Sequence, residues 1–167
     1  MTLRKILHFP NPKLRHIAKS IDHVDTEIKR LVDDMFETMY EDNGIGLAAT
    51  QLGIDLRVFV VDVNMDRKQQ LTFINPIITE KSGEQKCPEG CLSLPGIYAE
   101  VKRADKIKIE ALNRDGKPFT MQADGLLSAC IQHELDHLDG KLFIDYLSSL
   151  RKQLITKKLK KLRKRTL

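Results

Sequence analysis

The feature that most constrains this 167-residue chain is the segment His133-Glu134-Leu135-Asp136-His137. In a helix, residues four positions apart lie one turn apart on the same face. His133 and His137 can therefore share one metal ion, and Glu134 lies close enough to take a proton from a water molecule beside it. The alternative is a helix on which two surface histidines happen to be four residues apart.

The surrounding residues predict that this segment is helical. Asp124, followed by Gly125, can cap the N-terminus, and Gly140 can end the helix in the left-handed conformation. Between them, apolar residues recur at intervals of three and four: Leu126, Leu127, Cys130, Ile131, Leu135 and Leu138. The two histidines are thus expected on one helix face.

A hydrolytic metal site needs a third protein ligand and an open position for water. Phe143 stands where a metzincin protease has its third histidine, and no acidic residue follows Asp145. The third ligand must then come from upstream, where the candidates are His8, His16, His23, Cys87, Cys91 and Cys130. Cys130 is more typical of a small buried residue lining the site. Cys91, between Gly90 and Pro95, is equally compatible with a ligand and with an ordinary buried cysteine.

Three separate blocks of sequence are together far more specific than any one of them. They are Gly-Ile-Gly-Leu-Ala-Ala-Thr-Gln at 44–51, Glu-Gly-Cys-Leu-Ser at 89–93 and Gln-His-Glu-Leu-Asp-His at 132–137. In these motifs and their order the chain resembles the bacterial peptide deformylases, from the Asn11-Pro12 region to about Ser148. The resemblance implies a metallohydrolase that removes the N-formyl group from the N-terminal formyl-methionine of newly made proteins and releases formate.

The resemblance also implies a role for individual residues. Cys91, His133 and His137 hold one divalent ion, with Fe²⁺ expected as the most active metal and Zn²⁺ or Ni²⁺ as alternatives. Glu134 moves the proton, while the Gln51 side chain and the Leu92 backbone N–H stabilise the oxyanion. The residues expected to bind substrate are Gly44, Ile45, Gly46, Cys87, Glu89, Gly90, Leu126, Ala129 and Cys130.

The glycine block at 44–51 imitates a dinucleotide-binding fingerprint, which must follow a strand and open a helix. Here the block follows a predicted helix and precedes a predicted strand, which argues against that interpretation. A plain structural turn remains an alternative. The resemblance favours the border of the substrate cleft, where the backbone pairs with an extended peptide.

The predicted fold class is α+β, with antiparallel strands around a central metal-bearing helix and a C-terminal helix. The chain forms one domain, with a catalytic part at 1–147 and a basic helix or tail at 148–167. A helix is expected at 26–41, capped by Asp25. Because Asn75-Pro76 interrupts the second strand region, that region is expected at a sheet edge or at a bend. Strands are expected at 56–63, 71–79, 97–103, 106–112 and 117–122, the last two joined as a hairpin.

Charge is concentrated at the C-terminus. Residues 151–167 contain nine Lys or Arg and no acidic residue, whereas the rest of the chain has 19 basic and 23 acidic residues. Leucine and isoleucine spacing predicts an amphipathic helix at 148–164, and the resemblance suggests ribosome binding near the tunnel exit. Deleting 151–167 is expected to weaken that binding and to leave hydrolysis of a short formyl-peptide little changed. A solvated charged helix is the alternative.

Two other functional classes are alternatives to the enzyme. A nucleic-acid-binding module would use the basic tail with a structural metal, but aromatic interleaving is missing and a structural site normally has four protein ligands. An inactive homologue would not need Gln51, Cys91 and Glu134 together. No apolar run is long enough to span a membrane, and the N-terminus is too soon broken by Pro10 for a signal peptide. Three cysteines outside any disulfide framework suit a reducing cytoplasm, where we expect the protein. We also expect a monomer.

Overall fold

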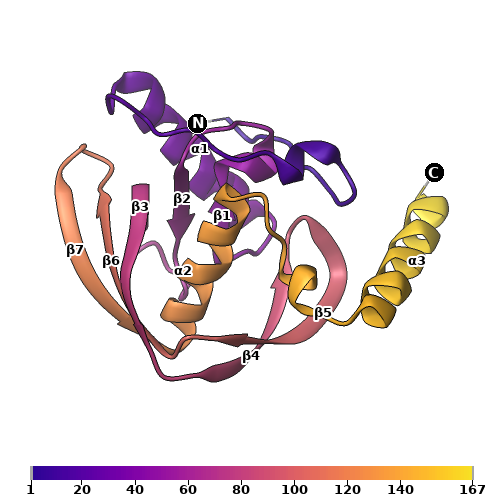
Figure 1. The fold of residues 1–167 in the computed structure, drawn as a ribbon. Helices are drawn as coiled ribbons and strands as arrows, with labels where there is room; N and C mark the ends of the chain where they lie inside the picture. Colours follow the sequence, from indigo (N-terminus) through magenta and orange to yellow (C-terminus); the bar gives the residue numbers. More distant parts are fainter. Residues whose placement is uncertain (1, 167) are drawn as a thin grey trace.

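The computed structural model describes residues 2–166 and has the predicted α+β architecture (Figure 1). The α-helices are α1 (Thr26–Glu41), α2 (Gly125–Leu138) and α3 (Ser149–Thr166). Short 3₁₀ turns are η1 (Pro12–Arg15), η2 (Ala49–Leu52) and η3 (Phe143–Tyr146). The predicted bounds of α1 are confirmed, and the Asp25 side chain accepts from the Ile28 N–H as a cap should.

The larger sheet is antiparallel, and its strand β2 (Val58–Val61) is buried on both faces. Its order is β1 (Gly46–Ala48), β2, β3 (Leu71–Ser82), β6 (Lys106–Leu112) and β7 (Pro118–Asp124). Alternate side chains of a strand point to opposite faces. Val58 and Val60 accordingly pack with α1, and Phe59 and Val61 pack in the cluster that includes α2. All four residues of β2 are buried, as packing on both faces requires.

Of the two positions predicted for Asn75-Pro76, a sheet edge or a bend, the structure has the bend. β3 lies between β2 and β6, and its pairing with β6 shifts register between Ile74 and Ile77. Asn75 adopts a φ of 51°, and its side-chain amide bonds the backbone N–H and C=O of Ile21, each at 2.8 Å. This bend lets a central strand accommodate proline.

A second, two-stranded sheet is a hairpin of β4 (Gln85–Cys91) and β5 (Leu94–Arg103). The sequence predicted only 97–103, because Cys87-Pro88-Glu89-Gly90 has little β-propensity and forms a strand through its pairing with β5. α2 lies at the centre of the molecule, between the larger sheet and this hairpin (Figure 1). Residues from both sheets can therefore meet at α2.

α3 packs beside the hairpin through one side only (Figure 1). Ile155 and Leu159 are buried in a cluster with Leu94, Ile97 and Phe143, whereas Leu150 and Leu154 are exposed. The buried apolar face of α3 is thus narrower than its leucine and isoleucine spacing predicts, because Leu150 and Leu154 are not part of it. Leu167 of the predicted tail lies outside the described residues. None of the helices in residues 2–166 has the length and apolar character needed to cross a membrane.

Candidate metal centre

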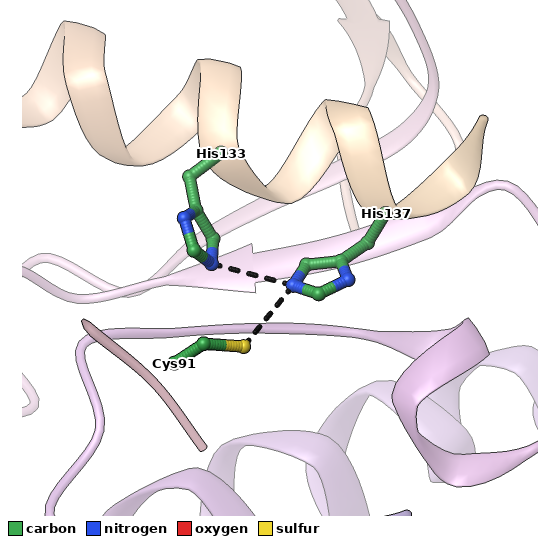
Figure 2. A group of neighbouring side chains, drawn as sticks. All are labelled: Cys91, His133 and His137. Carbon is green, nitrogen blue, oxygen red and sulfur yellow. Dashed lines mark hydrogen bonds between the residues drawn. The ribbon is translucent and has the colours of Figure 1, made fainter. Parts of the chain in front are cut away.

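Three potential metal ligands converge where α2 meets the end of β4 (Figure 2). His133 and His137 come from successive turns of α2, and their Nε2 atoms are 3.3 Å apart. The Sγ of Cys91, the last residue of β4, lies 3.4 Å from Nε2 of His137. All three ligand atoms lie within 4.8 Å of one another, which leaves Cys91 as the upstream candidate that joins the histidines.

The two short spacings, 3.3 Å between the histidine nitrogens and 3.4 Å from sulfur to the His137 nitrogen, fit a tetrahedral ion. With metal–nitrogen bonds of about 2.05 Å and a metal–sulfur bond of about 2.3 Å, two nitrogens would lie about 3.3 Å apart and sulfur about 3.5 Å from nitrogen. Burial also lowers the pKa of His137 well below its ordinary value, which favours the neutral imidazole that binds metal. A thiolate and two imidazoles suit zinc, iron and related ions.

Glu134 lies beside this centre on α2. Its side chain is buried, with Oε1 3.7 Å from Nε2 of His133. Among the described residues, its Oε2 is buried without a hydrogen-bond partner. Loss of solvation raises the pKa of Glu134 to about 7, with His133 opposing and Glu89 adding to the shift. A carboxyl group with a pKa near neutrality can both accept and return a proton.

The orientation of His133 is set from behind by Glu89. A carboxylate only accepts, so the His133 Nδ1, 2.8 Å from the Glu89 Oε1, carries a proton. Burial disfavours a charged His133, but hydrogen bonds with Cys91 and Glu89 outweigh it and raise the pKa of His133 well above its ordinary value, so an ion binding at Nε2 would displace a proton. Burial disfavours the charged form of Glu89, but hydrogen bonds from Arg103 and His133 outweigh it and lower the pKa of this carboxyl. Glu89 was predicted to bind substrate, yet both of its oxygens already have protein partners.

Gln51 is held in one orientation on the other side of Cys91. Its Oε1 accepts from the Ala48 N–H at 2.9 Å, so its Nε2 points toward the Ser93 Oγ at 3.1 Å and the Cys91 Sγ at 3.5 Å. Leu92 follows Cys91 directly in the turn between β4 and β5. The Gln51 amide therefore contacts the sulfur of a ligand residue, and Leu92 lines the cavity, whereas Gln51 is not among the residues that line it.

A cavity of about 790 Å³ opens onto two of the ligands, Cys91 and His133, and onto Glu134. Its walls include every residue predicted to bind substrate: Gly44, Ile45, Gly46, Cys87, Glu89, Gly90, Leu126, Ala129 and Cys130. The two glycines of the 44–51 block have a packing reason. A Cβ on Gly44 would lie 2.6 Å from Leu92 Cδ1, and one on Gly46 would lie 3.0 Å from Glu134 Cγ. The block is therefore fitted around the site rather than being a plain turn.

The chain is similar to known proteins over almost its whole length. The family model described as polypeptide deformylase matches residues 3–153. The chain belongs to this family. A peptide deformylase structure from Legionella pneumophila is 46% identical with a TM-score of 0.96, covering 99% of this chain and 98% of that one. One from Ehrlichia chaffeensis in complex with actinonin is 36% identical with a TM-score of 0.91, covering 96% and 98%. One from Thermotoga maritima is 38% identical with a TM-score of 0.84, covering 89% and 99%.

Sequence reasoning missed one prominent residue of this deformylase, Arg103. It lies at the end of β5, is almost fully buried, and bonds Glu89 and Asp136. Its partners are 14 and 33 residues away along the chain, and no spacing rule connects them. The only available signal was the presence of an arginine in a strand with an otherwise apolar inner face.

Proposed function

We propose that Cys91, His133 and His137 hold the divalent metal with which this deformylase removes the N-formyl group from newly made proteins. The observation that carries the proposal is the meeting of these three ligand atoms beside a buried, partly unpartnered Glu134 on a cavity wall. A closed structural site would need a fourth protein ligand and would give Glu134 no task. The substrate is the N-terminal formyl-methionyl segment of a nascent chain.

The reaction divides the work between the ion and the protein. When bound, the ion supplies a Lewis acid for the formyl carbonyl and lowers the pKa of a water molecule. Glu134 takes the proton of the attacking water and delivers it to the leaving nitrogen. The Gln51 amide and the Leu92 N–H donate hydrogen bonds to the oxygen on which negative charge develops. The C–N bond of the formamide breaks, giving formate and a free amino terminus.

The substrate backbone is proposed to pair with the open edge of β1. Among the described residues, β1 pairs with β2 and is the end strand of the larger sheet. An extended peptide can add to such an edge through main-chain hydrogen bonds. The methionine side chain would enter the apolar part of the cavity formed by Ile45, Cys87, Leu126, Ala129 and Cys130. Cysteine sulfur and small aliphatic groups suit a long thioether side chain.

We further propose Fe²⁺ as the most active metal, with Zn²⁺ or Ni²⁺ as substitutes. Ferrous iron beside a thiolate is sensitive to oxygen, so the protein should be prepared anaerobically. Elemental analysis and formate release from a formyl-Met peptide, measured on iron-loaded and zinc-loaded samples, test the proposal. Iron-loaded protein that carries one ion per chain but releases no formate would refute the activity.

For α3 we propose a contact with ribosomal RNA near the tunnel exit, made by a monomeric enzyme in the cytoplasm. Support comes from nine basic residues without any acid at 151–167, which suit a dense array of phosphates. Lys157, Lys160, Lys161 and Lys164 are exposed on this helix. Replacing these four by Glu should abolish co-sedimentation with ribosomes at low salt. Wild-type binding should itself weaken steeply as salt is raised.

Charge reversal is a cleaner test than deletion of the tail, because Ile155 and Leu159 belong to the apolar cluster against which Cys91 also packs. The four-Lys variant should hydrolyse a short formyl-peptide at the wild-type rate. If it still pelleted with ribosomes as the wild type does, the tail would not be the ribosome-binding element.

A further inference from the structure

A continuous series of side chains leads away from the metal centre, through the protein, to the far side of α2. It begins at His133, whose Nδ1 bonds Glu89, and passes from Glu89 to Arg103. Arg103 then bonds Asp136, and Asp136 accepts from the hydroxyl of Tyr146 on η3. The successive contacts measure 2.8, 2.7, 2.7 and 2.7 Å. No residue beyond Glu89 touches the substrate cavity.

Arg103 fixes the plane of the Glu89 carboxylate. Its Nε and Nη2 donate to the two Glu89 oxygens at 2.7 and 2.8 Å, the two-pronged arrangement that lysine cannot reproduce. The third branch, Nη1, donates to Asp136. Because the Arg103 side chain is only 4% exposed, its guanidinium has few other partners with which to exchange these bonds. Rotation of Glu89 away from His133 would therefore break the fork.

Tyr146 completes the series from the outside. Its hydroxyl donates to the same Asp136 Oδ2 that accepts from Arg103, and its ring centroid lies 4.9 Å from the guanidinium carbon. The residue is 51% exposed and lines a second cavity of about 300 Å³ together with Arg103 and Asp136. Core packing therefore does not explain its position, whereas its contacts with the arginine and the aspartate do.

We infer that Tyr146, Asp136 and Arg103 are positioning residues, which hold Glu89 so that His133 keeps its Nε2 directed at the metal. The inference rests on the proposed role of His133 as a ligand. A ligand ring that is locked before binding loses less rotational freedom when the ion binds, so the ion is released more slowly. Tyr146 thus influences metal retention through three intervening residues, Asp136, Arg103 and Glu89, without touching ion or substrate.

The chain contains a matched control for this inference. Tyr40 also donates its hydroxyl to a buried aspartate, Asp62, and also has an arginine, Arg67, stacked on its ring at 4.4 Å. None of these three residues lines the main cavity or is hydrogen-bonded to a metal ligand in the described part of the chain. Tyr40→Phe and Tyr146→Phe therefore remove the same group from two similar settings.

The test measures how fast a chelator removes Co²⁺ from the loaded protein, together with the visible spectrum of the bound Co²⁺. Tyr146→Phe should release the ion at least about threefold faster than wild type, and Arg103→Lys about 10- to 100-fold faster, with altered spectra. Tyr40→Phe should match wild type in both. Thermal unfolding of the metal-free proteins reports the purely structural cost of each Tyr→Phe substitution.

Equal release rates and spectra for Tyr146→Phe and Tyr40→Phe would overturn the inference, whatever their stabilities. Should Arg103→Lys fail to fold, Asp136→Asn takes its place, with the same expected direction. A failure of the metal assignment looks different. In that case wild type would not take up one Co²⁺ per chain, or His133→Ala would retain it as firmly as wild type.

Discussion

The anchoring of α3 can be measured with two substitutions on the same helix. Leu159 is 7% exposed within the apolar cluster shared with the hairpin, whereas Leu154, five residues earlier, is 58% exposed. Leu159→Ala and Leu154→Ala change helix propensity equally, because the same residue types are exchanged. The difference between the two variants therefore isolates the free energy of burying one leucine against β5 and its neighbours.

The expected magnitudes follow from this burial. Removing a buried leucine side chain costs about 2–5 kcal/mol, and a site on a docked surface helix belongs near the lower end, about 2–3 kcal/mol. Leu154→Ala should stay within about 0.5 kcal/mol of wild type. In a domain of this size each kcal/mol corresponds to roughly 2–4 °C, so Leu159→Ala should lower Tm by roughly 4–12 °C.

Urea unfolding of the metal-loaded proteins, followed by circular dichroism, gives the two free energies of unfolding. A formate-release assay on the same samples shows whether loosening α3 reaches Cys91, which packs against the same cluster. If Leu159→Ala and Leu154→Ala unfolded at the same urea concentration, α3 would not be docked as described. In that case deleting residues 151–167 would be expected to leave hydrolysis unchanged, because α3 would not support the cluster around Cys91.

Four further predictions concern the metal centre. Cys91→Ala, His133→Ala or His137→Ala should each lose metal and activity together, and full metal content in Cys91→Ala by elemental analysis would remove it as a ligand. Glu134→Gln should keep its metal while turnover falls by about 10²–10⁴-fold; a near-normal rate would exclude it as the base. Gly46→Ala places a Cβ 3.0 Å from Glu134 Cγ and should lower kcat roughly tenfold at unchanged metal content, whereas a wild-type kcat would show that Glu134 tolerates the shift. Removing the ion with a chelator should lower Tm, because the ion binds only the folded state; an unchanged Tm would mean weak or unspecific binding.

The sequence predicted the parts of the site that depend on local spacing. Helix periodicity and the four-residue interval were enough to place His133, Glu134 and His137 on α2, where the structure has them. Cys91 could not be placed from its surroundings alone, because its position depends on a hairpin whose first strand has weak β-propensity. The family resemblance, not the local pattern, selected it.

Long-range polar contacts were beyond the sequence for a physical reason. Arg103 and Glu89 come from neighbouring strands of the hairpin, whereas Asp136 lies on α2, and no interval along the chain relates the three. The pairing of β3 is likewise a long-range feature. Pro76 predicted a bend, but the sequence could not show that β3 pairs with β6 on both sides of that bend. Such contacts depend on which elements pack together, and this is decided by the whole core.

The shortness of β1 affects how much of a substrate's sequence the enzyme can recognise. Only Gly46–Ala48 forms this edge strand, and a 3₁₀ turn follows immediately at Ala49. An edge of three residues offers few hydrogen-bonding groups, and those it offers are main-chain groups, which are the same in every protein. A peptide seated there would be recognised mainly by its formyl group and first side chain. One such enzyme would then act on unrelated N-termini without matching any of their later sequences.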